Sequence, residues 1–183
     1  MTRSHRDRIE ALLRVEPVVS DLQLLQTIPP VLAGVRELLA GLADDLAETS
    51  GPVFGFPSAR LASPIKTEVV TATAALATAP ELAWVHGAGD LARPLVVARS
   101  NAGLVVSVCH SARSTRTAGE AGVETAAAYR GRGLATAVTA RWADEVRAQR
   151  RVPLYSTAWT NLASRGVARR LGLVMIGEDY TIG

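Results

Sequence analysis

A glycine-rich loop is the segment whose residue types and spacing could do chemistry. It reads Tyr-Arg-Gly-Arg-Gly-Leu-Ala-Thr from Tyr129 to Thr136 and opens a predicted helix. Glycines let a backbone approach a ligand closely, and the first N–H groups of a helix lack partners at the positive end of its dipole. Such a loop suits a phosphate or pyrophosphate. Arg130 and Arg132 add charge, and a cation at a helix N-terminus, which opposes the dipole, favours a bound anion.

Two common phosphate-binding motifs do not fit this loop. A Walker A loop ends in Gly-Lys-Ser/Thr, and no Lys is present here. A dinucleotide fingerprint reads Gly-x-Gly-x-x-Gly, but Thr136 stands at its last position. The two preceding predicted strands form a hairpin, so the context is not a parallel βαβ unit either.

A second block follows about thirty residues later and carries a resemblance. It begins with Asn-x-x-Ser from Asn161 to Ser164 and ends in Leu-Gly-Leu. Asn161 also suits a helix N-cap, and that purely structural role stays open. Together the two blocks resemble the GCN5-related N-acetyltransferase (GNAT) family. Its acetyl-CoA loop reads Arg/Gln-x-x-Gly-x-Gly/Ala, matched by Arg130, Gly133 and Ala135, and its later helix reads Asn-x-x-Ser and ends in Leu-Gly-Phe.

The resemblance covers about residues 91–183 and implies an enzyme that uses acetyl-CoA as co-substrate. The primary amine of a small molecule or a peptide would attack the thioester directly and take up the acetyl group. The strand segment at Val123 and Thr125 would bond pantetheine, and one of its N–H groups would polarise the acetyl carbonyl. Asn161 would contact the pantetheine arm between two splayed strands. The pyrophosphate would be held by Arg130, Gly131, Arg132, Gly133, Leu134, Ala135 and Thr136.

The resemblance also implies which residues would move protons. An amine with a pKa near 10.4 is only about a thousandth neutral at pH 7, so a base is needed. In many family members this base is a Glu on the strand before the loop, which favours Glu120, with Glu124 second. Both could instead be surface charges. The family's usual Tyr acid is replaced by Ala168, so Ser164, Tyr155 or water would protonate the leaving thiolate.

Other reactive residue types have simpler explanations. Cys109 is expected to be a small buried side chain on its strand. His110 could line the acceptor site or pair with a backbone carbonyl, and the second is preferred. Trp142 recurs at helical spacing and is expected in the core. One cysteine and three scattered histidines predict no metal site.

The hydrophobic pattern predicts the elements that would position these residues. Expected strands are 94–98, 104–109, 120–125, 153–157 and one starting at 173, and expected helices are 133–148 and 161–171. The fold class is α/β, a GNAT-like mixed and mostly antiparallel sheet flanked by helices. A helical N-terminal region over 1–90 would precede the core over 91–183. Within it, a short first helix would carry Ile9, Leu12 and Leu13, and 31–46 is an amphipathic helix matching the family's early helices. Residues 51–64 are expected to be a loop, and 65–79 a helix or a strand, with the helix preferred.

The predicted sheet is one strand shorter at its C-terminal end than the sheet of the family. The sequence ends soon after the strand that starts at Leu173, whereas the family commonly has a further final strand. That strand is therefore missing or supplied by a partner chain. A homodimer is the corresponding expectation.

Composition leaves two alternative functions open. The chain has 183 residues and a net charge of +3, and its basic charge is concentrated in residues 130–183, with nine Arg against four acidic residues. Basic charge permits nucleic-acid binding, but the small number of aromatic residues argues against it. A non-catalytic acyl-CoA-binding or regulatory module is the other alternative. The longest uncharged stretches are too short to span a membrane and the N-terminus has no apolar signal core, which predicts a cytoplasmic protein without membrane contact.

Overall fold

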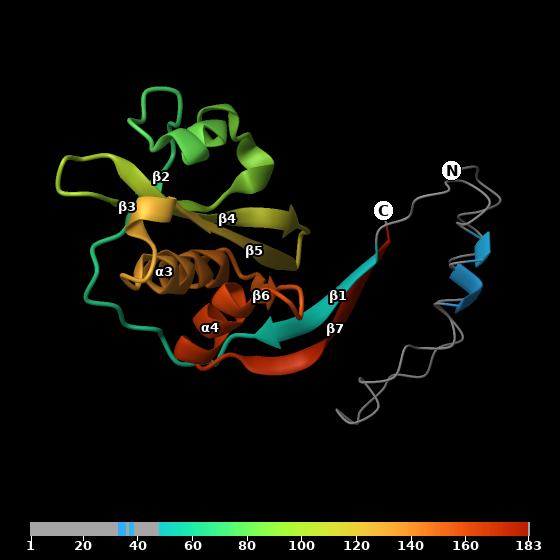
Figure 1. Cartoon of the computed structure of the whole chain (residues 1–183). Coiled ribbons are helices and arrows are strands. Elements are labelled where there is room, and N and C mark those ends of the chain that lie inside the picture. Colours follow the sequence, from blue (N-terminus) through green and yellow to red (C-terminus); the bar gives the residue numbers. More distant parts are fainter. Residues whose placement is uncertain (1–32, 36, 39–47, 183) are drawn as a thin grey trace. The chain divides into compact units, whose positions relative to one another are not determined.

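The computed structural model describes residues 33–35, 37–38 and 48–182 of the chain (Figure 1). The chain divides into two units, one formed by Pro52–Ile176 and the other by Met1–Gly51 with Gly177–Gly183. Residues 33–35 and 37–38 are helical, which agrees with the predicted amphipathic helix, while the rest of that prediction and the first predicted helix lie outside the described residues. No helix in the described ranges is long and apolar enough to cross a membrane.

A seven-stranded sheet organises the described chain, and its strands run in the order β2-β3-β4-β5-β6-β1-β7. The pairs β2–β3, β3–β4, β4–β5 and β6–β1 are antiparallel, and β5–β6 is parallel. The predicted mixed, mostly antiparallel GNAT-like sheet is therefore confirmed. The strands are β1 (Glu48–Gly55), β2 (Glu68–Val70), β3 (Leu95–Arg99), β4 (Val105–Ser114), β5 (Ala118–Thr125), β6 (Val152–Ser156) and β7 (Val174–Ile182).

Two α-helices follow β5 and β6, and three short 3-10 helices connect other strands. The α-helices are α3 (Leu134–Ala148) and α4 (Leu162–Arg170), close to the predicted 133–148 and 161–171. The 3-10 helices are η2 (Pro80–Gly87), η3 (Asp90–Ala92) and η4 (Ala127–Tyr129). In Figure 1, α3 and α4 lie on one side of the sheet and the green segment containing η2 lies on the other.

The central strands are buried on both faces, which explains their continuous apolar runs. Side chains alternate between the faces of a strand. On β3, Val96 and Ala98 pack with α3, whereas Leu95 and Val97 pack with Leu82 and its neighbours on η2. Trp142 on α3 is fully buried, as predicted. A Cβ on Gly119 of β5 would lie 3.5 Å from the Trp142 ring, which is an ordinary packing distance, so the indole packs directly against β5.

The region before residue 90 corrects the sequence interpretation. Glu48–Gly55 is strand β1 where the helix end and the loop over 51–64 were expected. Glu68–Val70 is strand β2 inside the segment 65–79, for which a helix was preferred and a strand left open. The Gly and Pro residues of β1 looked like loop signals. Its strand state comes from pairing with β6, in which Val53 faces Ser156 a hundred residues later.

Strand β7 is longer than the predicted segment. It extends to Ile182, and β1 lies between β6 and β7. All seven strands of the described sheet come from this chain, while a further strand supplied by a partner chain stays a prediction.

Candidate functional site

The strands β5 and β6 separate part of the way along their length. Their parallel register runs from Ala118–Val152 to Glu120–Leu154, whereas β5 continues to Thr125. Beyond Glu120, β5 remains paired with β4 on its other side as far as Thr125, which faces Ser107. The segment 121–125 therefore has one paired edge and one edge that faces the opening between β5 and β6.

The backbone groups of Val123 and Thr125 point into this opening. Ala126 donates its N–H to the Val106 carbonyl at 2.9 Å, and hydrogen-bonded pairs alternate along an antiparallel ladder. The residues that bond β4 are therefore Gly122, Glu124 and Ala126, and the two between them face the other way. The Thr125 carbonyl confirms this direction, because it accepts a hydrogen bond from Arg130 Nε at 3.2 Å.

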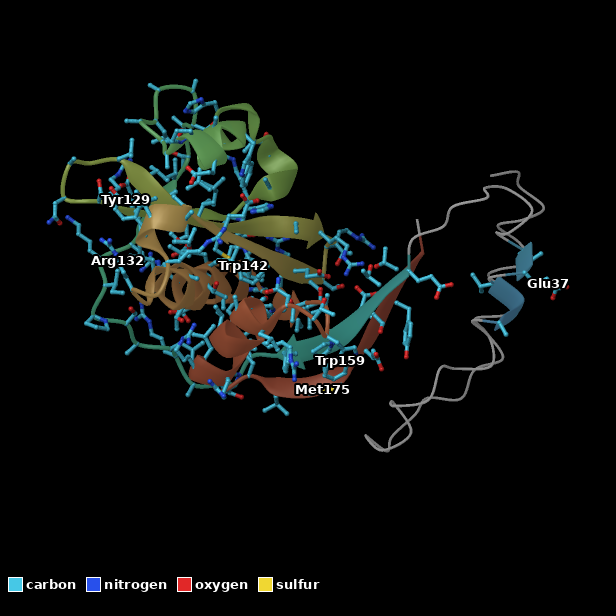
Figure 2. The ribbon with its side chains drawn as sticks, in the orientation of Figure 1. Glu37, Tyr129, Arg132, Trp142, Trp159 and Met175 are labelled. Atoms are coloured by element: carbon cyan, nitrogen blue, oxygen red, sulfur yellow. The ribbon has the colours of Figure 1, made fainter. Side chains whose placement is uncertain are left out.

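The glycine-rich loop lies between η4 and α3 and is exposed. Gly131 and Gly133 have φ values of +75° and +78°, which only glycine adopts without strain. The first bond of α3 runs from the Ala137 N–H to the Gly133 carbonyl, so the N–H groups of Leu134, Ala135 and Thr136 come before the helical bonding pattern. Arg132 stacks over the Tyr129 ring at 5.0 Å (Figure 2). The loop thus presents N–H groups, a helix dipole and two guanidinium groups at one place.

A third arginine reaches the start of α3 from α4. Arg170 Nε donates to Thr136 Oγ1 at 3.3 Å. Sequence reasoning did not assign Arg170, although it stands directly before the Leu-Gly pair that carries the resemblance. The contact depends on the packing of α4 against α3, which no local pattern reveals.

Glu120 lies where β5 and β6 begin to separate, and its carboxylate is held by two partners. Arg113 Nε and a terminal guanidinium nitrogen of Arg113 donate to its two oxygens at 2.8 and 3.0 Å. Ser156 Oγ of β6 donates to Oε1 at 2.7 Å. A carboxylate has about four acceptor positions, so these three bonds leave capacity for one more donor.

Glu124 lies on the same face of β5 and contacts a residue that the sequence did not suggest. Its Oε2 accepts a hydrogen bond from Trp84 Nε1 of η2 at 3.2 Å. The Trp84 ring meets the His110 ring edge-on, with centroids 4.7 Å apart. His110 therefore lies beside an aromatic ring and a carboxylate. Burial lowers the pKa of His110, against the opposing effects of the Glu124 charge and of a hydrogen bond with the Gly122 backbone, which agrees with the preferred expectation of a backbone partner.

Asn161 and Ser164 occupy the first turn of α4. Asn161 Oδ1 accepts the Ser164 N–H at 3.0 Å, so the N-cap role is present, and the NH2 end of the side chain stays outside the cap. Ser164 Oγ lies 2.6 Å from the hydroxyl oxygen of Tyr155. Tyr155 is only 1% exposed, and burial raises the pKa of its phenol. The two hydroxyls form a hydrogen-bonded pair between β6 and α4.

Cys109 is fully buried on β4 and burial raises the pKa of its thiol. The expectation of a small buried side chain is confirmed. Because the thiolate is the reactive form, we expect native protein to resist alkylation by iodoacetamide and to react only after unfolding in guanidinium. Mass spectrometry after a timed exposure measures this. Rapid labelling of folded protein would contradict the packed position of Cys109.

No group of three or more His, Cys, Asp or Glu side chains that could hold a metal ion occurs within the described residues. The polar groups that converge on the site are instead backbone N–H groups, guanidinium groups, carboxylates and hydroxyls. This set suits a phosphate-bearing ligand at the loop and a proton-transfer reaction beside the opening between β5 and β6.

Comparisons with known proteins concern the family and the fold. Residues 96–182 match the family model of GNAT acetyltransferases. A GCN5-related N-acetyltransferase-like protein from Streptococcus suis is similar with a TM-score of 0.58 and 18% identity, over 81% of this chain and 66% of that one. A GNAT-family acetyltransferase from Colwellia psychrerythraea is similar with a TM-score of 0.57 and 16% identity, over 84% of this chain and 61% of that one.

A third similar structure is a GCN5-related N-acetyltransferase from Kribbella flavida. It has a TM-score of 0.54 and 17% identity, over 82% of this chain and 63% of that one. The chain thus spans less than two thirds of the length of these structures, and at such identities the similarity shows the fold. A search of curated proteins finds no match.

Proposed function

We propose, from a chain that has the GNAT fold and whose residues 96–182 match the GNAT acetyltransferase family, that the protein transfers an acetyl group from acetyl-CoA to a primary amine. The observation that carries the proposal is the juxtaposition of two features. An anion-binding loop opens α3, and it directly follows a strand whose Val123 and Thr125 backbone groups face an opening. A ligand that joins a pyrophosphate to a long polar arm would use the loop for its pyrophosphate and the open strand edge for its arm.

The residues of the loop fit the phosphate end of acetyl-CoA. Gly131 and Gly133 allow close approach because they carry no side chain at positive φ. The N–H groups of Leu134, Ala135 and Thr136 would donate to the pyrophosphate, and Arg130, Arg132 and Arg170 would surround it with positive charge. Val123, Thr125 and Asn161 would bond the pantetheine arm between β5 and β6.

When bound, acetyl-CoA supplies the acetyl group as a reactive thioester. The Val123 N–H would stabilise the negative charge that develops on the acetyl oxygen. Glu120 would accept the amine proton, directly or through a water, at its remaining acceptor position. Arg113 and Ser156 hold that carboxylate in one orientation. The amine would thus reach the acetyl carbon from the face of the sheet that carries Glu120 and Glu124.

The hydroxyl pair of Tyr155 and Ser164 would protonate the leaving thiolate in place of the Tyr that Ala168 replaces. Burial raises the pKa of the Tyr155 phenol, so Tyr155 is protonated at neutral pH and has a proton to donate. We expect Tyr155→Phe to lower kcat about tenfold, less than a usual general acid contributes, because a thiolate leaves readily. Stopped-flow detection of free thiol measures kcat.

The control for this variant separates catalysis from packing. Tyr155→Phe should bind acetyl-CoA as the wild type does, and Ser164→Ala, which keeps the phenol, should lose less activity. An unchanged kcat in Tyr155→Phe would remove the pair from the mechanism and leave protonation to water.

The proposed function is tested first by titration calorimetry of the chain with acetyl-CoA, followed by thiol release with a panel of primary amines. Binding and amine-dependent thiol release would support the acetyltransferase. Binding without release from any amine would favour the non-catalytic acyl-CoA-binding module. No binding by folded protein would refute both.

A further inference from the structure

Trp84, His110 and Glu124 form a cluster on the sheet face opposite α3, which we call the acceptor cluster. The Trp84 N–H donates to the Glu124 carboxylate at 3.2 Å, and the Trp84 and His110 rings meet at 4.7 Å. Trp84 is 36% exposed and Glu124 is exposed. The Trp84 indole is thus exposed and held against a carboxylate, and nothing in the proposed handling of acetyl-CoA uses it.

The cluster lies next to the backbone that faces the opening. Gly122 and Glu124 are the chain neighbours of Val123, whose N–H points between β5 and β6. The His110 ring occupies the space beside Gly122, because a Cβ on that glycine would lie 2.5 Å from His110 Cε1. The acceptor cluster therefore begins one residue away from the group proposed to polarise the acetyl carbonyl.

The charges around the cluster favour a cation. Glu81 belongs to the same 3-10 helix as Trp84 and accepts the Ala127 N–H at 3.3 Å, and Glu120 and Glu124 project from β5. Arg113 pairs with Glu120, so the negative charge of Glu81 and Glu124 is what the cluster presents. His110 adds no charge at neutral pH, because burial lowers its pKa. Its Nδ1 is buried and has no hydrogen-bond partner among the described residues.

We propose that the acceptor carries a second cationic group in addition to its reacting amine, and that the acceptor cluster binds this second group. The inference rests on the proposed function and extends it to a substrate class, a diamine or a similar polycation. The reacting nitrogen must be neutral when it attacks. A carboxylate beside an indole binds a charge that persists, through an ion pair and a cation–π contact.

Three amines with the same four-carbon chain test the substrate class. They are 1,4-diaminobutane, butylamine and 4-aminobutyrate, whose far ends are cationic, neutral and anionic. We expect kcat/KM to be about tenfold higher for 1,4-diaminobutane than for butylamine, which corresponds to about 1.4 kcal/mol. The value for 4-aminobutyrate should be lower still. Glu124→Gln should reduce the preference for 1,4-diaminobutane severalfold while the Kd for acetyl-CoA stays unchanged.

A matched control and a direct binding measurement make the test independent of turnover. Glu68→Gln makes the same charge change on β2, where Glu68 pairs with Arg99, and should keep the wild-type preference. Calorimetric titration of 1,4-diaminobutane into the protein without acetyl-CoA should show binding that Glu124→Gln and Trp84→Leu weaken.

The two proposals fail in different ways. A missing response to acetyl-CoA would refute the acetyltransferase while the diamine titration still measured the cluster. No diamine binding, equal use of 4-aminobutyrate, or a preference that survives Glu124→Gln would overturn the acceptor class.

Discussion

Gly131→Asp is expected to raise the Kd for acetyl-CoA about a hundredfold, whereas Gly103→Asp should leave it unchanged. The aspartate would place a negative charge where the loop is proposed to hold the pyrophosphate, and like charges at close range repel. A hundredfold weakening corresponds to about 2.7 kcal/mol, within reach of one repulsive charge at a partly exposed site.

The two glycines form a matched pair because they share their conformation and differ in location. Gly131 has φ +75° and Gly103, in the turn between β3 and β4, has φ +80°. A Cβ at either position meets nothing within 4 Å. Each substitution therefore incurs a similar left-handed strain of about 1–2 kcal/mol, so thermal melting should fall by a similar amount in both variants.

Titration calorimetry with acetyl-CoA, accompanied by a melting curve for each variant, measures the effect. If both variants bound as weakly as each other, the loss would reflect strain and not the loop. If both bound as the wild type does, the pyrophosphate would have to lie elsewhere, and the role proposed for the glycine-rich loop would be refuted.

The parts of the fold that follow local patterns could be predicted from the sequence. The helix 133–148 was expected from apolar residues every four positions, and α3 spans Leu134–Ala148. The predicted helix 161–171 is followed by Gly172, whose φ of +62° is the conformation that a glycine directly after a helix commonly adopts. These features depend on neighbours within a few residues, which the sequence displays directly.

The parts of the fold that depend on distant partners could not be predicted from the sequence. β1 contains Gly and Pro and becomes a strand because β6 pairs with it, and β2 becomes a strand beside β3. The same holds for the site. The loop residues were predicted from spacing, whereas Arg170 reaches Thr136 and Trp84 reaches Glu124 only through the tertiary fold. Glu120 was expected on chemical grounds, but its bonds to Arg113 and Ser156 come from two other strands.

Val123→Pro is expected to lower kcat about a hundredfold or more while leaving the fold intact. A proline has no N–H, so the variant removes the one donor proposed to stabilise charge on the acetyl oxygen, and loss of such a donor costs about 10²–10³ in kcat. The Val123 N–H does not bond β4, because the bonded positions are Gly122, Glu124 and Ala126. Proline is tolerated where the N–H of a strand residue faces away from its partner strand.

Val123→Ala is the control, because it shortens the same side chain and keeps the N–H. We expect it to retain most of the wild-type kcat, and both variants should bind acetyl-CoA, since the pyrophosphate loop is untouched. Thiol release at saturating acetyl-CoA and amine gives kcat, and circular dichroism verifies the fold of each variant. Equal activity of a folded Val123→Pro and Val123→Ala would show that polarisation of the carbonyl does not use this N–H. A large loss in the proline variant alone would place the acetyl group at the point where β5 and β6 separate, between the loop that binds phosphate and the face that carries Glu120.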